Sequence, residues 1–358
     1  MSRKVIIAGG GTGGHIFPAI AIGQALQRLD DRIELLFVGA KGKMEMTTIP
    51  QAGFPIVGLD IAGFNRSAPW KNVGLPWKLV KSAFQAGGLL RRHKPSVVVG
   101  VGGYASFPML RAAQKKGIPT LIQEQNSFAG KSNQILARDA RTICTGYEGM
   151  EKFFPADKIV YTGNPVRPLI TQSHASREDG IRFFQLDPAR PTVLAFGGSL
   201  GARSINAAIG AGLDLLKDQG LQLIWQTGKG NPAPQGRHGV WAQEFITHME
   251  MAYAAADVVV ARAGALTIAE LCVAAKPVIF VPYPHAAEDH QTVNAMSLVR
   301  RDAGLLVPDK DARGELVTRL LQLARDPALQ QKLKTNIARL AIWDADERIA
   351  REILKLMP

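Results

Sequence analysis

Cysteine is scarce in this chain of 358 residues, since Cys144 and Cys272 are the only two and each lies in an apolar segment. Two such distant cysteines exclude a disulfide framework and lack the paired spacing of a zinc site, so a reducing cytosol is expected. Long uncharged apolar runs are missing as well. Residues 5–27 carry no Asp, Glu, Lys or Arg, but their six glycines and one proline make a poor membrane span. No secretory signal is visible, so we expect a soluble chain, or one bound only to a membrane surface.

Aromatic residues are few, and acids are outnumbered by bases. Aromatics make up 7% of the chain, and 43 Lys and Arg against 30 Asp and Glu give a formal net charge of +13. A basic balance favours anionic partners, namely phosphorylated ligands, nucleic acid or an anionic membrane face. No zinc-finger or RNA-binding signature is present, so nucleic acid is disfavoured as a partner.

The most informative positive feature is a glycine-rich loop that occurs twice. One apolar segment leads into Gly9-Gly10-Gly11-Thr12-Gly13-Gly14, and another leads into Gly197-Gly198-Ser199-Leu200-Gly201. Each unit is typical of a buried strand, a tight turn and a helix, which together direct backbone N–H groups at an anion. When the two loops are aligned, Thr12 falls on Ser199 and Gly14 on Gly201.

Short apolar segments alternate with helical patterns along the chain, which predicts two doubly wound α/β domains with parallel sheets. The length is also that of two domains. The expected strands are 4–8, 34–38, 97–101, 119–123, 141–145, 158–161, 192–196, 221–226, 240–246, 257–261 and 277–281. The expected helices of the first half are 16–28, 43–51, 75–93, 106–116 and 130–137. In such folds ligands bind at the carboxyl ends of the strands.

The pattern changes at residues 163–168, which a polar stretch follows, so the domain boundary is expected there. The predicted domains are residues 1–163 and 164–340. The charged amphipathic segment 341–358 is expected to form a helix that packs back towards the N-terminal domain.

The first loop satisfies the pattern G-x-G-x-x-G, which alone is a weak signal. A dinucleotide site also needs an acidic residue at the end of the second strand, where this chain has Gly39-Ala40-Lys41. The Lys-Ser/Thr of a Walker A loop is missing too. His15 lies directly after the glycines. It is either a general base for a ligand over the loop, or a hydrogen-bond donor to the diphosphate of such a ligand, or a residue that only caps the helix.

Two segments of the second half follow predicted strands and are rich in polar groups. Gly264 permits a turn into a helix whose first N–H groups can hold a diphosphate, and Glu270 lies where a carboxylate can accept both hydroxyls of a ribose. The alternative is an ordinary helix start, in which the negative charge of Glu270 interacts favourably with the helix dipole. Residues 282–295 offer partners for sugar hydroxyls or form a solvated loop, and their histidine spacing is unsuited to zinc.

Two loops of the first half, 102–106 and 123–126, also follow predicted strands, and together they predict a pocket for a second substrate. Asp344-Ala345-Asp346 is an Asp-x-Asp segment. It lies on the tail, so we interpret it as a solvated face and expect no metal dependence.

Residues 70–94 mix bulky apolar residues with Lys and Arg, and no acid occurs in residues 65–123. This stretch is either an interfacial membrane surface or a core-packing helix with a basic outer face.

Seven motifs, taken together and in order along the chain, resemble the MurG family of bacterial N-acetylglucosamine transferases. They are residues 10–15, 102–104, 124–126, 163–167, 197–202, 264–267 and 285–291. The resemblance implies a GT-B fold, in which two Rossmann-like doubly wound domains face an interdomain cleft. It implies an enzyme without a cofactor, peripheral to the cytoplasmic face of the bacterial inner membrane, with residues 70–94 on the anionic lipid surface.

The resemblance also implies the reaction, an inverting, metal-independent transfer of GlcNAc from UDP-GlcNAc. The acceptor would be the C4 hydroxyl of MurNAc in undecaprenyl-diphospho-MurNAc-pentapeptide, as in peptidoglycan synthesis. In the first domain His15 would be the catalytic base and Asn126 would lie near the reacting hydroxyl. Thr12, Gly13 and Gly14 would meet the acceptor diphosphate and the donor sugar.

In the second domain the resemblance implies the donor site. Arg167 and Ser199 would hold the nucleotide and its diphosphate, Ile246 would contact uracil through its backbone, and Gln291 would touch GlcNAc. The helix start would complete this set with Ala265, Leu266, Thr267, Ile268, Ala269 and the ribose ligand Glu270.

One departure from the family concerns Gln123, where the family often has histidine. A catalytic base at this position is therefore excluded, which favours His15 as the base. A UDP-GlcNAc epimerase on the same scaffold and a non-catalytic membrane-recruitment subunit are the rival interpretations. Residues 70–94 and the loop after Gly102 argue against the epimerase, and the intact substrate loops argue against the recruitment subunit.

Overall fold

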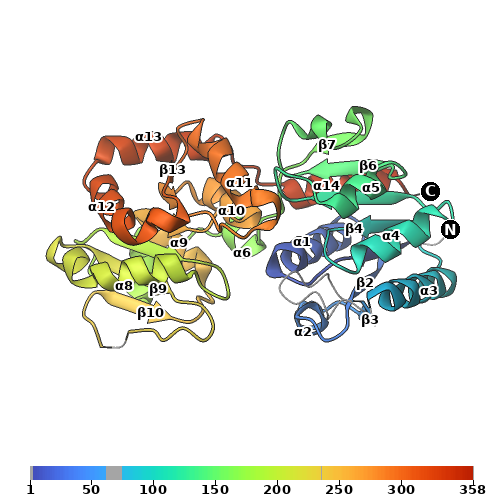
Figure 1. Ribbon diagram of the computed structural model, residues 1–358, viewed down its shortest axis with the longest axis horizontal. Coiled ribbons are helices and arrows are strands. Elements are labelled where there is room, and N and C mark those ends of the chain that lie inside the picture. The colour runs from blue at the N-terminus through green and yellow to red at the C-terminus, as the bar shows by residue number, and fades with distance from the viewer. Residues whose placement is uncertain (1–2, 62–74, 235, 358) are drawn as a thin grey trace. The chain divides into compact units, whose positions relative to one another are not determined.

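The computed structural model describes residues 3–61, 75–234 and 236–357 (Figure 1). The chain divides into two compact units. Unit 1 comprises Met1–Val166 with Asp344–Pro358, and unit 2 comprises Arg167–Trp343. These boundaries lie within a few residues of the sequence-based ones, and each unit is described by itself below.

Unit 1 is built on a seven-stranded sheet of order β3-β2-β1-β4-β5-β6-β7, with parallel pairing throughout. Its strands are β1 (Lys4–Ala8), β2 (Glu34–Ala40), β3 (Ile56–Leu59), β4 (Val97–Gly100), β5 (Thr120–Glu124), β6 (Thr142–Thr145) and β7 (Ile159–Tyr161). Its helices are α1 (Gly13–Leu29), α2 (Glu45–Gln51), α3 (Leu75–His93), α4 (Ser106–Gln114), α5 (Lys131–Ala137) and α14 (Ala345–Lys355), with 3-10 turns at Met150–Lys152 and Ala156–Lys158. The strand order reverses at β1, so the loops after β1 and β4 flank the switch point where such sheets bind ligands.

The alternation of side chains along β1 explains why helices cover both faces of this sheet. Val5 and Ile7 belong to an apolar core shared with α1 and α14. Ile6 and Ala8 belong to a second core shared with α3, α4 and α5. All four side chains are buried, as expected for a parallel strand that is apolar along its whole length.

The last helix, α14, packs within unit 1, with Ile349 and Ile353 fully buried in the core that contains α1. Arg28 of α1 donates to Asp346 at 2.6 Å, and Asp344 pairs with Arg348 at 2.8 Å. Both acids of the Asp-x-Asp segment are therefore engaged in ion pairs, one with α1 and one within the start of α14.

Unit 2 is built on a six-stranded parallel sheet of order β10-β9-β8-β11-β12-β13. Its strands are β8 (Thr192–Phe196), β9 (Gln222–Gln226), β10 (Val240–Gln243), β11 (Val258–Ala261), β12 (Val278–Phe280) and β13 (Leu305–Leu306). Its helices are α6 (Pro168–Thr171), α7 (Arg177–Phe183), α8 (Arg203–Asp218), α9 (Met249–Ala255), α10 (Ala265–Ala274), α11 (His290–Val299), α12 (Ala312–Ala324) and α13 (Pro327–Ala338), with 3-10 turns at Ala287–Asp289 and Asp309–Asp311. Helices α8, α12 and α13 bury their apolar faces in one core against the sheet.

All the strands expected from sequence are present, but the sequence analysis misses β3 and β13. Both lie at sheet edges, where all of their residues except Leu59 are only partly buried, so neither forms a conspicuous apolar run. β10 ends at Gln243 rather than at residue 246, and α1 begins at Gly13, three residues before the expected start.

The two glycine-rich loops differ more than their alignment suggests. That alignment places Gly13, the first residue of α1, on Leu200, whereas α8 begins only at Arg203. Thr12 is therefore the residue directly before its helix, while Ser199 lies within a longer loop. The repeat consists of strand and turn, with different spacing to the helix.

The second loop provides a matched pair of glycines for a stability test. Gly198 and Gly201 have φ values of +85° and +76°, so alanine is strained at both. A Cβ at Gly201 would lie 2.0 Å from the Thr227 carbonyl oxygen, whereas a Cβ at Gly198 would meet nothing within 4 Å. We expect Gly198→Ala to lower the unfolding free energy by about 1–2 kcal/mol and Gly201→Ala by more than about 3 kcal/mol. Urea unfolding of both variants measures this difference, and equal losses would contradict the crowding at Gly201.

Candidate active site

The first glycine-rich loop uses its early amides inside the fold. Gly9 N–H donates to the Val38 carbonyl at 3.0 Å, and Gly10 N–H donates to the Gly102 carbonyl at 3.3 Å. Gly11 N–H donates to a Glu45 carboxylate oxygen at 2.8 Å. The amides of Thr12, Gly13 and Gly14 stand at the start of α1, where a helix has no internal acceptors.

Glu45 lies beneath this loop and was not singled out from sequence. Its residue is 1% exposed, and its carboxylate accepts from Ala40 N–H at 3.0 Å as well as from Gly11 N–H. A Cβ on Gly10 would lie 2.4 Å from the Glu45 carboxyl carbon. Glu45 therefore joins β2, α2 and the glycine turn, and fixes the conformation in which Thr12 to Gly14 face outward.

His15 follows the loop in the first turn of α1 and lies against the loop after β4. A Cβ on Gly102 would lie 2.7 Å from its Cε1. His15 Nδ1 is buried, without a hydrogen bond to any residue that the structure describes. Burial lowers the pKa of His15 below its ordinary value of 6.5, and the negative charge of Glu124 opposes this only in part. A histidine held neutral near pH 7 is able to accept a proton.

Position 123, where the family often has histidine, contributes to a buried amide network in this chain. Gln123 is fully buried and donates to Asn164 Oδ1 at 3.1 Å. Gln125 donates to the Val101 carbonyl at 2.8 Å and also to the Gln123 side chain, while Asn164 donates to the Gln125 carbonyl at 2.9 Å. These bonds join the ends of β4 and β5 to the chain after β7, and they give Gln123 a structural role.

The loop that contains Asn126 is held by the buried carboxylate of Glu124. Its Oε1 accepts from Asn126 N–H at 3.1 Å. Its Oε2 accepts from Gly130 N–H at 3.2 Å and from Asn133 Nδ2 at 2.8 Å. Asn126 itself is partly exposed at the carboxyl end of β5, in the position expected of a ligand-binding side chain.

In unit 2 the start of α10 follows β11, and Gly264 is the residue before the helix. Ala265, Leu266 and Thr267 form its first turn, whose amides have no internal acceptor. The Ile268 amide instead donates to the Gly264 carbonyl at 3.0 Å, and Ala269 lies further into the helix. Only the first three members of the predicted set therefore have amides without an acceptor inside the helix.

Glu270 is engaged by two side chains of the same unit. Arg167 Nε donates to Oε1 at 2.7 Å and Arg167 Nη2 donates to Oε2 at 3.1 Å. The Tyr253 hydroxyl donates to Oε2 at 3.1 Å. Burial alone would lower the pKa of Arg167, but the adjacent Glu270 charge raises it, so the guanidinium stays protonated. Arg167 and Glu270, 103 positions apart in sequence, are therefore brought together within unit 2.

The remaining residues of the predicted donor site lie on separate segments of unit 2. Ser199 is exposed, and its carbonyl accepts from Lys229 N–H at 2.9 Å. Ile246 is buried, and its N–H already donates to Gln226 Oε1 at 2.9 Å. The expected backbone contact with uracil therefore has to use another polar group of this segment. Gln291 Oε1 accepts from Tyr283 N–H at 3.0 Å, which leaves its amide nitrogen as the donor to a ligand.

Three residues of this arrangement escaped the sequence analysis: Glu45, Tyr253 and Gln226. Glu45 and Tyr253 stand on helices and belong to no recognisable motif. Gln226 had a usable signal, because it is a polar residue at the carboxyl end of a predicted strand.

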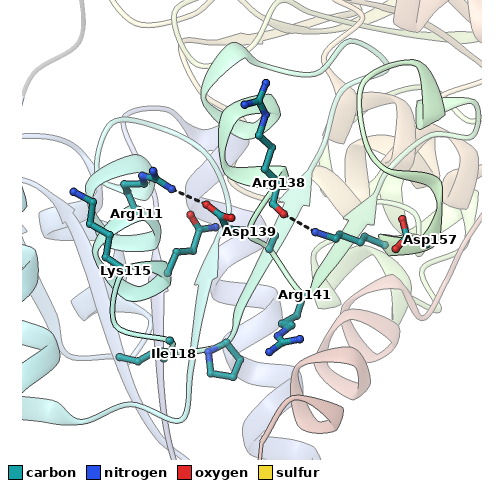
Figure 2. A pocket seen from close by; sticks show the side chains of 12 residues that line it. Arg111, Lys115, Ile118, Arg138, Asp139, Arg141 and Asp157 are labelled. Carbon is teal, nitrogen blue, oxygen red and sulfur yellow. Dashed lines mark hydrogen bonds and ion pairs between the residues drawn. The ribbon is translucent and has the colours of Figure 1, made fainter.

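A cavity of about 690 Å³ lies elsewhere in unit 1, at the amino ends of β5, β6 and β7 (Figure 2). No residue of the predicted site lines it. Arg111 donates to Asp139 at 2.7 Å, and Lys158 donates to the Arg138 carbonyl at 2.7 Å. The charged residues lining it are Arg111, Lys115, Arg138, Arg141, Lys158, Asp139 and Asp157. The cavity is thus basic, but it lies at the sheet edge opposite the ligand loops.

The described part of the chain comprises residues 3–61, 75–234 and 236–357. No helix there is long and apolar enough to cross a membrane. No group of three or more His, Cys, Asp or Glu side chains is arranged there to hold a metal ion.

Two parallel-sheet units, each with a glycine-rich turn at the switch point of its sheet, form the architecture of the GT-B fold. The model of the glycosyltransferase family 28 N-terminal domain matches residues 5–145, and that of the family 28 C-terminal domain matches residues 192–349. The chain therefore belongs to glycosyltransferase family 28 and, by the relatives described next, to its MurG members. The family and fold class expected from sequence are confirmed.

A relative from Phocaeicola vulgatus is 50% identical over 361 residues, which cover 99% of this chain and 96% of that protein. It is named UDP-N-acetylglucosamine–N-acetylmuramyl-(pentapeptide) pyrophosphoryl-undecaprenol N-acetylglucosamine transferase. The crystal structure of Acinetobacter baumannii MurG matches with a TM-score of 0.78 and 28% identity over 98% of this chain and 99% of that one. A UDP-GlcNAc 2-epimerase from Neisseria meningitidis matches with a TM-score of 0.67 but only 14% identity, over 98% of this chain and 100% of that one, and so shares the fold alone.

Proposed function

We propose that this enzyme transfers GlcNAc from UDP-GlcNAc to the C4 hydroxyl of MurNAc in undecaprenyl-diphospho-MurNAc-pentapeptide, a step of peptidoglycan synthesis. The observation that carries this proposal is the 50% identity over 99% of the chain to a relative named as this transferase. The rival epimerase is supported only by a likeness of fold.

The donor belongs to unit 2 in this proposal. Glu270 accepts the ribose hydroxyls, and the first turn of α10 receives the diphosphate on its N–H groups. As the bond from C1 to the diphosphate breaks, its electron pair leaves with UDP. The helix N-terminus and the Arg167 guanidinium stabilise this growing negative charge, so no metal is required in the proposed mechanism.

The acceptor and the base belong to unit 1. Thr12, Gly13 and Gly14 present amides to the lipid-linked diphosphate, and Asn126 orients the hydroxyl. The C4 oxygen attacks C1 on the face opposite UDP, forms the new glycosidic bond and inverts the anomeric centre. Its proton passes to the neutral imidazole of His15.

A UDP-release assay with a short-chain lipid-linked acceptor, run in the presence of EDTA, tests this function. We expect UDP release only when the acceptor is present, because attack by the acceptor hydroxyl drives departure of UDP. Formation of UDP-ManNAc without acceptor would establish the epimerase instead. The absence of both products would favour the recruitment subunit.

The proposed setting is the anionic cytoplasmic face of the inner membrane, with α3 as the contact. Trp77 and Phe84 on this helix are 73% and 77% exposed, while Ala86 and Leu90 are buried in the core. The helix thus packs inward along one side and presents large apolar groups on another. The adjoining residues 70–74 of the expected surface lie outside the described residues. Helix α4 packs beside α3, and its end lines the basic cavity, so positive charge lies on the same unit (Figures 1 and 2).

Removal of the two aromatic side chains should weaken membrane binding. We expect Trp77→Ala/Phe84→Ala to lower partitioning onto anionic vesicles at least roughly tenfold, because both rings lose their insertion into the lipid interface. The matched control is Leu215→Ala, which removes a half-exposed apolar group from α8 of unit 2. Vesicle co-sedimentation measures both, and equal partitioning of the double variant and the wild type would contradict α3 as the contact.

A further inference from the structure

The Glu270 carboxylate is enclosed by hydrogen-bond donors of its own unit. It accepts two hydrogen bonds from Arg167 and one from Tyr253, all within unit 2. Glu270 is 8% exposed and Tyr253 is 2% exposed. Three hydrogen bonds from protein groups therefore engage the carboxylate assigned to the ribose.

The acceptor capacity of one carboxylate limits what it can bind at once. An ionised carboxylate offers roughly four lone-pair positions. Three are used by Arg167 and Tyr253, so the two hydroxyls of a ribose exceed the remaining capacity. At least one existing bond must break when the nucleotide enters.

The two protein donors differ in how firmly they are held. The Tyr253 ring is buried on α9 and packs edge-on against Phe196, with centroids 6.2 Å apart. Phe196 is the last residue of β8, directly before the second glycine loop. The Tyr253 ring therefore packs against the sheet, and this contact restrains the position of its hydroxyl. The Arg167 side chain is 28% exposed and precedes the short helix α6. It is also a cation for which an incoming diphosphate competes with Glu270.

Tyr253 keeps its proton under all working conditions. Burial raises the pKa of its hydroxyl well above 10, and the neighbouring Glu270 charge raises it further. The hydroxyl can therefore only donate to Glu270, and its bond does not vary with pH near neutrality.

We propose that Tyr253 is a positioning residue for the nucleotide ribose, and that Arg167 exchanges Glu270 for the diphosphate when the nucleotide binds. Tyr253 stays bonded to Glu270 Oε2 and leaves Oε1 aimed at the ribose diol. Arg167 pairs with Glu270 in this structure and moves to the phosphates when the nucleotide binds. This inference rests on the proposed function, because it takes the ligand to be a uridine diphosphate.

The test compares UDP with 2′-deoxy-UDP by calorimetry on the wild type and on Tyr253→Phe, which keeps the ring and its contact with Phe196. We expect the variant to lose roughly tenfold in affinity for UDP. We expect a smaller loss of affinity for 2′-deoxy-UDP. The ratio of the affinities for UDP and 2′-deoxy-UDP should therefore be smaller in the variant than in the wild type. In turnover, KM for UDP-GlcNAc should rise while kcat holds, because the ribose contact is equal in the ground state and the transition state.

A purely structural role of Tyr253 would give another pattern. Equal losses for both nucleotides with a lowered melting temperature, or unchanged discrimination, would overturn the inference. A structure with UDP bound provides the second readout. The Tyr253 hydroxyl should remain hydrogen-bonded to Glu270 while Arg167 has left, and retention of both Arg167 bonds would contradict the exchange. If the wild type binds no UDP at all, or Glu270→Ala binds UDP as tightly as the wild type, the proposed function itself fails.

Discussion

His15→Ala should lower kcat by roughly 10²- to 10⁴-fold, the usual contribution of a positioned general base. The proposed mechanism gives His15 the proton of the attacking hydroxyl, and no other described side chain at this loop has been assigned that task. The variant should fold, because alanine is favourable in the first turn of α1. KM for UDP-GlcNAc should stay within a few-fold of the wild type, since the donor contacts belong to unit 2. Steady-state kinetics with a short-chain acceptor measures both quantities, and full activity of the variant would remove the histidine from the mechanism.

The pH dependence gives an independent check on the same residue. Burial lowers the pKa of His15 below 6.5, so the imidazole remains neutral, and able to accept a proton, down to that lowered value. Activity should therefore fall only as pH drops below 6.5. This acid limb of the kcat/KM profile should be absent from the residual activity of His15→Ala. An acid limb centred above pH 6.5 would contradict a depressed His15 as the base.

Glu270→Ala should weaken UDP binding by roughly 100-fold or more, because hydrogen bonds to a charged group contribute about 1.5–3 kcal/mol each. Two ribose hydroxyls lose their acceptor in this variant. The effect should appear in KM for UDP-GlcNAc and much less in kcat, since the ribose does not change during the reaction. Calorimetry with UDP measures the loss directly.

The matched control is Glu315→Ala, which removes an exposed carboxylate from α12 of the same unit. It lowers the charge equally but touches no predicted donor residue. Similar UDP affinities for Glu270→Ala and Glu315→Ala would refute the assigned ribose contact.

Much of the fold could be predicted because the sheets are parallel and covered on both faces. Strands such as Val97–Gly100 are apolar at every position, and this pattern is visible in a single sequence. The edge strand Leu305–Leu306 has only two, partly buried residues, so its place depends on pairing with β12 rather than on its own composition. Local pattern identifies the core strands, and tertiary pairing defines the edges.

The parts of the candidate site in which the backbone conformation requires a particular residue type could be predicted from sequence. The contacts between side chains far apart in the sequence could not. The glycine-rich turns could be predicted because only glycine fits at some of their positions. Gly10, Gly103 and Gly201 have positive φ angles and close contacts that exclude a side chain. Glu45 and Tyr253 act through single long-range hydrogen bonds from helices of ordinary composition. The loop alignment that equated Thr12 with Ser199 failed to predict the helix start, because the second loop is longer before α8.

The most direct test of the account follows the sugar itself. Wild-type protein would be incubated with UDP-GlcNAc labelled in the sugar and a short-chain undecaprenyl-type diphosphate carrying MurNAc-pentapeptide, and the products analysed by mass spectrometry and NMR. The account predicts the label in a lipid-linked disaccharide whose GlcNAc is joined to C4 of MurNAc with inverted anomeric configuration. Label that stays in a UDP-sugar, or that reaches the lipid at another hydroxyl or with retained configuration, would contradict it.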